Sequence, residues 1–139
     1  MDSDNRGGVG YGCIVEVAMI LLNFSRKLNH DQKEQVEALS GLEIERAYTL
    51  ELGNFQGSEP YQPQIKQAFE RFPFDPDFYH SYDILVNLPN SGPLAVLVLV
   101  ELHHRMGRYP KILRMGILPV INTMLLPHQD VQEVIDLGG

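Results

Sequence analysis

The chain has 139 residues, with a hydrophobic fraction of 44%, a charged fraction of 21% and a formal net charge of −7. This length suits one globular domain, and no apolar run reaches the roughly 18 residues that a membrane span needs. We therefore expect a soluble protein with no membrane partner. The acidic balance excludes long duplex nucleic acid as a partner, because such binding needs many Lys and Arg contacts to phosphates. A small anionic ligand is compatible with it, since a helix N-terminus binds phosphate through backbone N–H groups.

The first segment of the chain differs in composition from the rest. Residues 1–18 begin polar and rich in glycine, and they lack the basic and apolar segments of a secretory signal. They predict a disordered leader or extension before a single domain over residues 19–139; the alternative is an additional strand over Cys13–Ala18. Cys13 is the only cysteine, which excludes an intramolecular disulfide and cysteine-rich zinc patterns and favours a reducing, cytoplasmic location.

The first half of the domain predicts a strand, a helix and a second strand. Residues 19–24 form a short apolar run typical of a buried strand. Asn29 can then cap a helix that stops at Gly41. Residues 44–52 mix apolar and charged side chains, which indicates a strand with a wet face near an edge of the sheet. The turn-rich segment 53–62 is longer than most connections and is a candidate binding loop.

The second half continues the alternation. Pro63 opens a helix over residues 63–72, and residues 82–88 are apolar in nearly continuous order, as in a central strand. The helix over residues 93–106 is apolar nearly all round, so we expect it to be buried. Residues 111–118 and 131–137 predict two further strands. This order predicts an α/β fold, a Rossmann-like domain of three layers with a mostly parallel sheet of about five strands and one antiparallel edge.

Polar residues follow the predicted strands where a parallel sheet binds ligands. In such sheets the site lies beyond the carboxyl ends of the strands, near the point where the strand order reverses. Asn23, Ser25 and Arg26 follow the first strand, and Asn87, Asn90 and Ser91 follow the central one. Amides, hydroxyls and helix N-termini suit a polar, anionic small molecule. The alternative interpretation is that these residues only cap helices and form turns.

The sequence lacks two common nucleotide-binding motifs, and its paired histidines are poorly placed for a metal site. The phosphate-loop triplet Gly-Lys-Ser/Thr and the Gly-x-Gly-x-x-Gly dinucleotide signature after a strand are both missing from the sequence. His103 and His104 fall in the last turns of a predicted helix, at the end opposite to the candidate loops. Adjacent helical residues point about 100° apart and share one metal poorly, so we interpret the pair as helix-capping or intersubunit residues and expect neither a metal nor a cofactor.

Three segments together resemble a known family. MILLNFS at 19–25, ILVNLP at 84–89 and ELHHRMGRYP at 101–110 are similar in order and spacing to a small family of type III CRISPR-associated accessory proteins with a Rossmann-like domain. The resemblance runs from Met19 to about Leu137, and residues 1–18 lie outside it. It implies binding of a cyclic oligoadenylate second messenger of antiviral defence, most directly cyclic tetra-adenylate.

The resemblance also implies site residues and an assembly. The implied ligand contacts are Asn23, Phe24, Ser25, Arg26, Asn87, Pro89, Asn90, Ser91, Gly92 and Arg114. One small domain cannot surround a cyclic tetranucleotide, which implies a homodimer or a higher homo-oligomer, with a filament as an open-ended form.

The sequence does not decide between binding and catalysis. Sequestration of the messenger is the favoured function. The first alternative is a metal-independent ring nuclease that cleaves cyclic tetra-adenylate to linear di-adenylate, because the ribose 2′-hydroxyl supplies its own nucleophile and no triad is required. The second is a scaffold domain that binds a partner other than a nucleotide.

Overall fold

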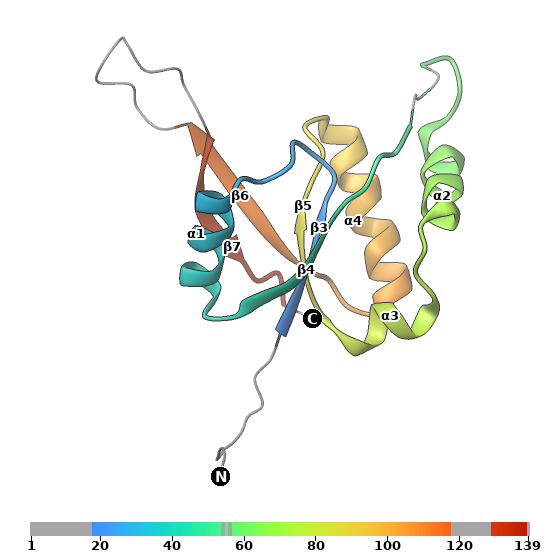
Figure 1. Ribbon diagram of the computed structural model, residues 1–139. Coiled ribbons are helices and arrows are strands. Elements are labelled where there is room, and N and C mark those ends of the chain that lie inside the picture. The colour runs from blue at the N-terminus through green and yellow to red at the C-terminus, as the bar shows by residue number, and fades with distance from the viewer. Residues whose placement is uncertain (1–17, 54, 56, 118–128, 139) are drawn as a thin grey trace.

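The computed structural model describes residues 18–53, 55, 57–117 and 129–138. The predicted leader, apart from Ala18, and the end of the predicted strand at residue 118 lie outside this part of the chain. The described elements follow one another in a regular alternation (Figure 1). They are β3 (Ala18–Asn23), α1 (His30–Ser40), β4 (Glu43–Thr49), α2 (Tyr61–Arg71), α3 (Pro76–Ser81), β5 (Asp83–Asn87), α4 (Gly92–Met106), β6 (Lys111–Ile117) and β7 (Gln129–Ile135).

The five strands in the described ranges form one sheet in the order β4-β3-β5-β6-β7. The pairs from β4 through β6 are parallel, and β7 is antiparallel to β6. The predicted α/β class with a mostly parallel sheet is therefore confirmed, and so are the antiparallel strand at one edge and the partly wet strand, β4, at the other.

The core lies on both faces of this sheet, because successive strand residues point to opposite sides. On one face Leu22 and Val86 pack with residues from α2, α3 and α4. On the other face Leu21 and Leu85 pack with Val36 of α1. The result is three layers, with α1 on one side of the sheet and the remaining helices on the other (Figure 1).

Local sequence signals explain where the helices begin and end. The Asn29 side chain accepts a hydrogen bond from the Gln32 backbone N–H at 2.8 Å, and the Gln32 side chain accepts one from the Asn29 N–H at 2.9 Å, which is a capping box. The helix stops at Gly41, whose φ of 74° is in the left-handed region that favours glycine. Gly107 ends α4 in the same conformation, with a φ of 77°.

The helical layer differs from the prediction in two places. α3 was not predicted, because its start contains Asp75 and Pro76, which also read as a break; here Asp75 caps the helix by accepting from the Phe78 N–H at 2.9 Å. The expectation that α4 is buried nearly all round was wrong. Val98 faces the core, but Val96 and Val100 are 60% and 51% exposed, because the helix packs on the sheet by one side only.

Smaller shifts affect the element boundaries. α2 begins at Tyr61, two residues before the predicted start at Pro63, and the last strand is Gln129–Ile135 in place of 131–137.

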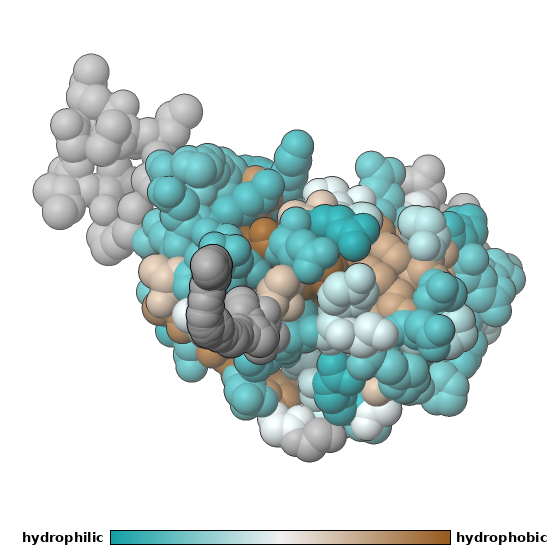
Figure 2. Space-filling view, turned by 60° about the horizontal axis from the view of Figure 1, so that its bottom comes forward, coloured by the Kyte–Doolittle hydropathy of each residue, from teal (hydrophilic) through white to brown (hydrophobic). Residues whose placement is uncertain are grey.

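None of the helices in the described ranges is long and apolar enough to cross a membrane. Seen from the side where the parallel strands begin, the surface is mostly hydrophilic, with apolar residues between the polar ones (Figure 2).

Truncation of a central strand residue tests this packing. Leu85 is fully buried between the layers, so Leu85→Ala should lower the free energy of unfolding by about 2–5 kcal/mol, because it removes apolar contacts and leaves a cavity. Leu39→Ala removes the same atoms from a side chain that is 51% exposed and should change it by less than about 0.5 kcal/mol. Urea denaturation measures both, and equal effects would contradict the packing.

Candidate functional site

The strand order reverses between β3 and β5. The chain leaves β3 through α1 to reach β4 on one side, and it leaves β5 through α4 to reach β6 on the other. The two connections cross opposite faces of the sheet, so the carboxyl ends of β3 and β5 flank the point where ligands bind in open α/β sheets. Asn23 and Asn87 are the last residues of these strands and are paired in the sheet register.

Asn23 and Asn87 meet in a hydrogen-bonded network at this point. Asn87 Nδ2 donates to Asn23 Oδ1 at 3.0 Å. The same Oδ1 atom accepts from the Ser25 backbone N–H at 3.1 Å, and Asn23 Nδ2 donates to the Arg26 carbonyl at 2.8 Å. Asn23 is only 2% exposed and Asn87 6%. The network therefore fixes the loop after β3 against the end of β5.

Backbone hydrogen bonds extend the sheet past these residues. The Phe24 N–H donates to the Asn87 carbonyl at 2.8 Å, and the Leu50 N–H donates to the Asn23 carbonyl at 2.8 Å. The carboxyl ends of β3, β4 and β5 are thus hydrogen-bonded to one another. We call this region, formed by residues 23–26 and 87–92, the strand-end rim.

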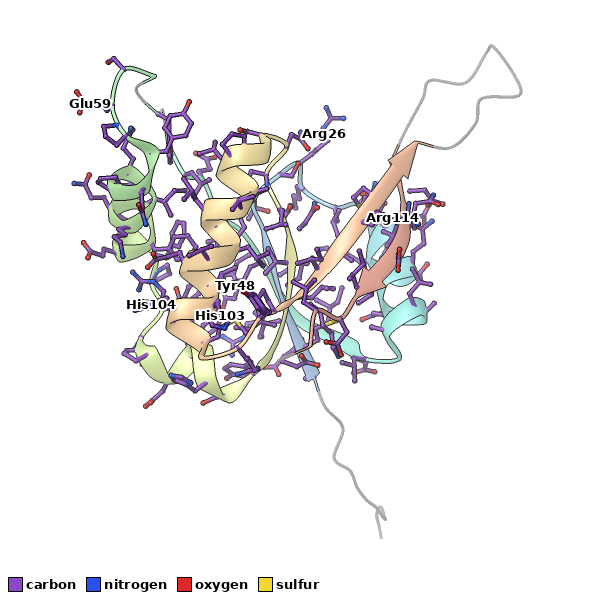
Figure 3. All side chains as sticks on the ribbon, turned by 180° about the vertical axis from the view of Figure 1, so that it is seen from behind. Arg26, Tyr48, Glu59, His103, His104 and Arg114 are labelled. Atoms are coloured by element: carbon purple, nitrogen blue, oxygen red, sulfur yellow. The ribbon has the colours of Figure 1, made fainter. Side chains whose placement is uncertain are left out.

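The outer part of the strand-end rim offers polar groups to solvent. Arg26 is exposed and lies at the same end of the molecule as the start of α4 (Figure 3), and among the described residues it has no acidic partner. Asn90 and Ser91 are exposed. Ser91 is the N-cap of α4 but makes no side-chain cap hydrogen bond, so the first-turn N–H groups and the positive end of the helix dipole are not neutralised by that hydroxyl.

Several of the predicted site residues have structural roles. The Phe24 side chain is buried and packs against Phe69 and Phe72, with ring centroids 5.8 and 6.1 Å apart. Arg114 lies on β6, where its Nε atom is 2.9 Å from an oxygen of Glu133 on β7. Pro89 is partly buried and Gly92 begins α4. Asn23 uses both amide atoms within the chain. Its bonds to Ser25 and Arg26 are local and fit the turn-forming alternative, whereas the bond from Asn87 depends on which strand ends are neighbours and was missed.

The histidines predicted to lie away from the site do so. His103 and His104 are near the C-terminal end of α4, at the opposite end of the molecule from Arg26 (Figure 3). The His103 ring packs against Tyr109 with a centroid distance of 4.2 Å. No group of three or more metal-binding side chains occurs within the described ranges.

No family model, no curated protein and no solved structure matches this chain.

A cavity of about 420 Å³ lies outside the strand-end rim, between α2, α3 and the C-terminal half of α4. Its lining includes Glu101, which is nearly buried and forms ion pairs with Arg105 at 2.8 Å and Lys66 at 3.6 Å. The i,i+4 spacing of Glu101 and Arg105 is visible in the sequence, but the approach of Lys66 from α2 is not. Because its charges are largely paired with one another, we interpret this cavity as structural.

Tyr79 of α3 also lines this cavity, and its buried phenol predicts that stability depends on pH. Burial raises the pKa of Tyr79 above its ordinary value of 10.0, opposed by the positive charge of Arg105. An unfolded tyrosine loses its proton near pH ~10, whereas the buried one keeps it. The unfolded state then binds fewer protons, so the free energy of unfolding should fall as the pH rises above about 10.

Tyr79→Phe should make this alkaline loss of stability less steep, because the variant has no phenol to ionise. Tyr109→Phe is the matched control, because it removes the same hydroxyl group from an exposed residue outside this cavity. Denaturation at a series of pH values measures the slopes. An unchanged slope in Tyr79→Phe would contradict the assignment.

Asn23→Ala should destabilise the fold, because it leaves the buried Asn87 amide and two backbone groups of the loop without their partner. We expect the free energy of unfolding to fall by about 2 kcal/mol. Asn90→Ala, at an exposed position of the same rim, should change it by less than about 0.5 kcal/mol. Chemical denaturation compares the variants, and a loss for Asn23→Ala no larger than for Asn90→Ala would show that the network contributes little.

Proposed function

We propose that this protein binds a cyclic oligoadenylate, most directly cyclic tetra-adenylate, at the strand-end rim and lowers its free concentration by sequestration. The observation that carries the proposal is the meeting of Asn23 and Asn87 at the reversal of strand order, 3.0 Å apart. The segments that contain them are two of the three on which the family resemblance depends.

The chemistry of the rim supports a ligand with both phosphates and bases. Arg26 and the first turn of α4 can approach phosphates, the first by charge and the second through backbone N–H groups. The amides and hydroxyls of Asn87, Asn90 and Ser91 are suited to base edges and ribose hydroxyls. The net charge of −7 does not oppose this, because the contacts are local.

The size of the ligand supports an assembly. A cyclic tetranucleotide has rotational symmetry, and identical rims on two copies of this chain would contact equivalent parts of it. We therefore propose that a homodimer or a larger homo-oligomer forms the complete site. Sequestration needs only this binding, whereas ring cleavage also requires that a 2′-hydroxyl be aligned for attack on the adjacent phosphate.

Replacement of Arg26 tests the proposed site. The purified protein at micromolar concentration should retain labelled cyclic tetra-adenylate. Arg26→Ala should lower the affinity for this ligand about 10-fold or more, because a charge-assisted contact is lost. Lys66→Ala removes the same charge from exposed Lys66 on α2, outside the rim, and should leave the affinity within about 2-fold.

Two results would overturn the proposal. If the unmodified protein does not retain the ligand, nucleotide binding is excluded and the scaffold alternative stands. If chromatography of the ligand after prolonged incubation shows linear di-adenylate, the protein is a ring nuclease and sequestration is not its main function.

A further inference from the structure

The orientation of the Asn23 side-chain amide is fixed by two backbone groups. The Ser25 N–H can only donate, so the atom of Asn23 that faces it at 3.1 Å must be the oxygen. The Arg26 carbonyl can only accept, so the atom that faces it at 2.8 Å must be the nitrogen. Rotation of this amide by half a turn would place two donors together and two acceptors together. Asn23 therefore has one orientation.

The orientation of Asn87 follows from that of Asn23. The atom of Asn87 that lies 3.0 Å from Asn23 Oδ1 must be a donor, which is Nδ2. The remaining polar atom, Oδ1, is turned away from Asn23. Within the described part of the chain no group donates to it, although Asn87 is only 6% exposed. A largely buried acceptor without a donor is unfavourable by itself and favours a ligand that supplies one.

We infer that Asn87 Oδ1 is a specificity-determining acceptor of the strand-end rim, and that Asn23 is the positioning residue that holds it in this orientation. This inference rests on the proposed function. The group that it recognises is a neutral hydrogen-bond donor of the ligand. In an oligoadenylate two groups have this chemistry, the 6-amino group of adenine and the 2′-hydroxyl of ribose.

The fixed orientation matters because a free asparagine does not discriminate. An amide that can rotate offers either its oxygen or its nitrogen, and it accepts a donor and an acceptor about equally well. An amide that cannot rotate opposes a ligand that offers an acceptor at that position or that lacks the donor. The Ser25 N–H and the Arg26 carbonyl fix the orientation of Asn23, and Asn23 fixes that of Asn87. Asn87 can therefore discriminate between a donor and an acceptor on the ligand.

Two ligand analogues separate the two donors. Cyclic tetra-inosinate carries a carbonyl oxygen in place of each 6-amino group, and cyclic tetra-2′-deoxyadenylate lacks the hydroxyls. The unmodified protein should bind cyclic tetra-adenylate at least about 10-fold more tightly than the analogue that lacks the recognised donor. Parity among all three ligands would overturn the inference and leave the proposed function intact, whereas failure to bind tetra-adenylate would refute the proposed function itself.

Asn87→Ala tests whether the discrimination comes from Asn87. This variant should bind cyclic tetra-adenylate about 10-fold more weakly, and the penalty for the discriminating analogue should disappear. Asn23 keeps its two backbone partners in this variant, so the loop is retained and circular dichroism should be unchanged. If Asn87→Ala weakens all three ligands equally, or none of them, Asn87 is not the acceptor and the inference is wrong.

Asn23→Ala tests the relay. Freed from Asn23, the Asn87 amide can rotate, so the penalty for the discriminating analogue should become smaller while tetra-adenylate is still bound. A merely structural role of Asn23 would weaken all ligands in proportion and leave their ratio unchanged, which would overturn the positioning role. If Asn23→Ala does not fold, binding of the three ligands to the unmodified protein and to Asn87→Ala still tests whether Asn87 is the acceptor.

Discussion

The hydrogen bond between two buried side-chain amides, Asn23 and Asn87, is the interaction on which the candidate site depends. Both residues end parallel strands at the point where the strand order reverses. Burial of a polar side chain is unfavourable unless it is hydrogen-bonded, and here Asn87 Nδ2 and both amide atoms of Asn23 have partners. Here the pair also fixes the loop after β3, because Asn23 bonds to Ser25 and to the Arg26 carbonyl. The loop that carries an exposed cation is therefore held at a defined place.

The packing beneath this pair explains why the strand ends hold their positions. β3 and β5 contribute residues to both core clusters, one beneath α1 and the other beneath α2, α3 and α4. A slip of either strand by one residue would exchange the side chains that face α1 with those that face α2, α3 and α4, and would move a polar residue at a strand end. The two amides are therefore aligned by the hydrophobic residues that precede them in β3 and β5. The geometry of the candidate site thus depends on the packing of the core.

The architecture was predictable because the strands and helices have strong local patterns. The alternation of strands and helices was visible in the apolar runs of β3 and β5 and in the capping residues of α1. The handedness rule for crossover connections then predicted a parallel sheet. The rim was predictable as a region for the same reason. The individual long-range contacts were not predictable: nothing in the local sequence shows that Phe24 packs against Phe69, that Arg114 pairs with Glu133, or that Asn87 donates to Asn23. α3 and the exposed side of α4 were missed because they depend on what lies beside them in space.

The antiparallel direction of β7 has a practical consequence for how the protein can be handled. Because β7 runs back against β6, the described chain finishes on the side of the sheet where β3 starts, opposite to the strand-end rim (Figure 1). Attachments made on the side of the molecule where β3 begins and β7 ends would therefore lie away from the strand-end rim. A protein immobilised in this way would keep the exposed part of the strand-end rim turned toward the solution.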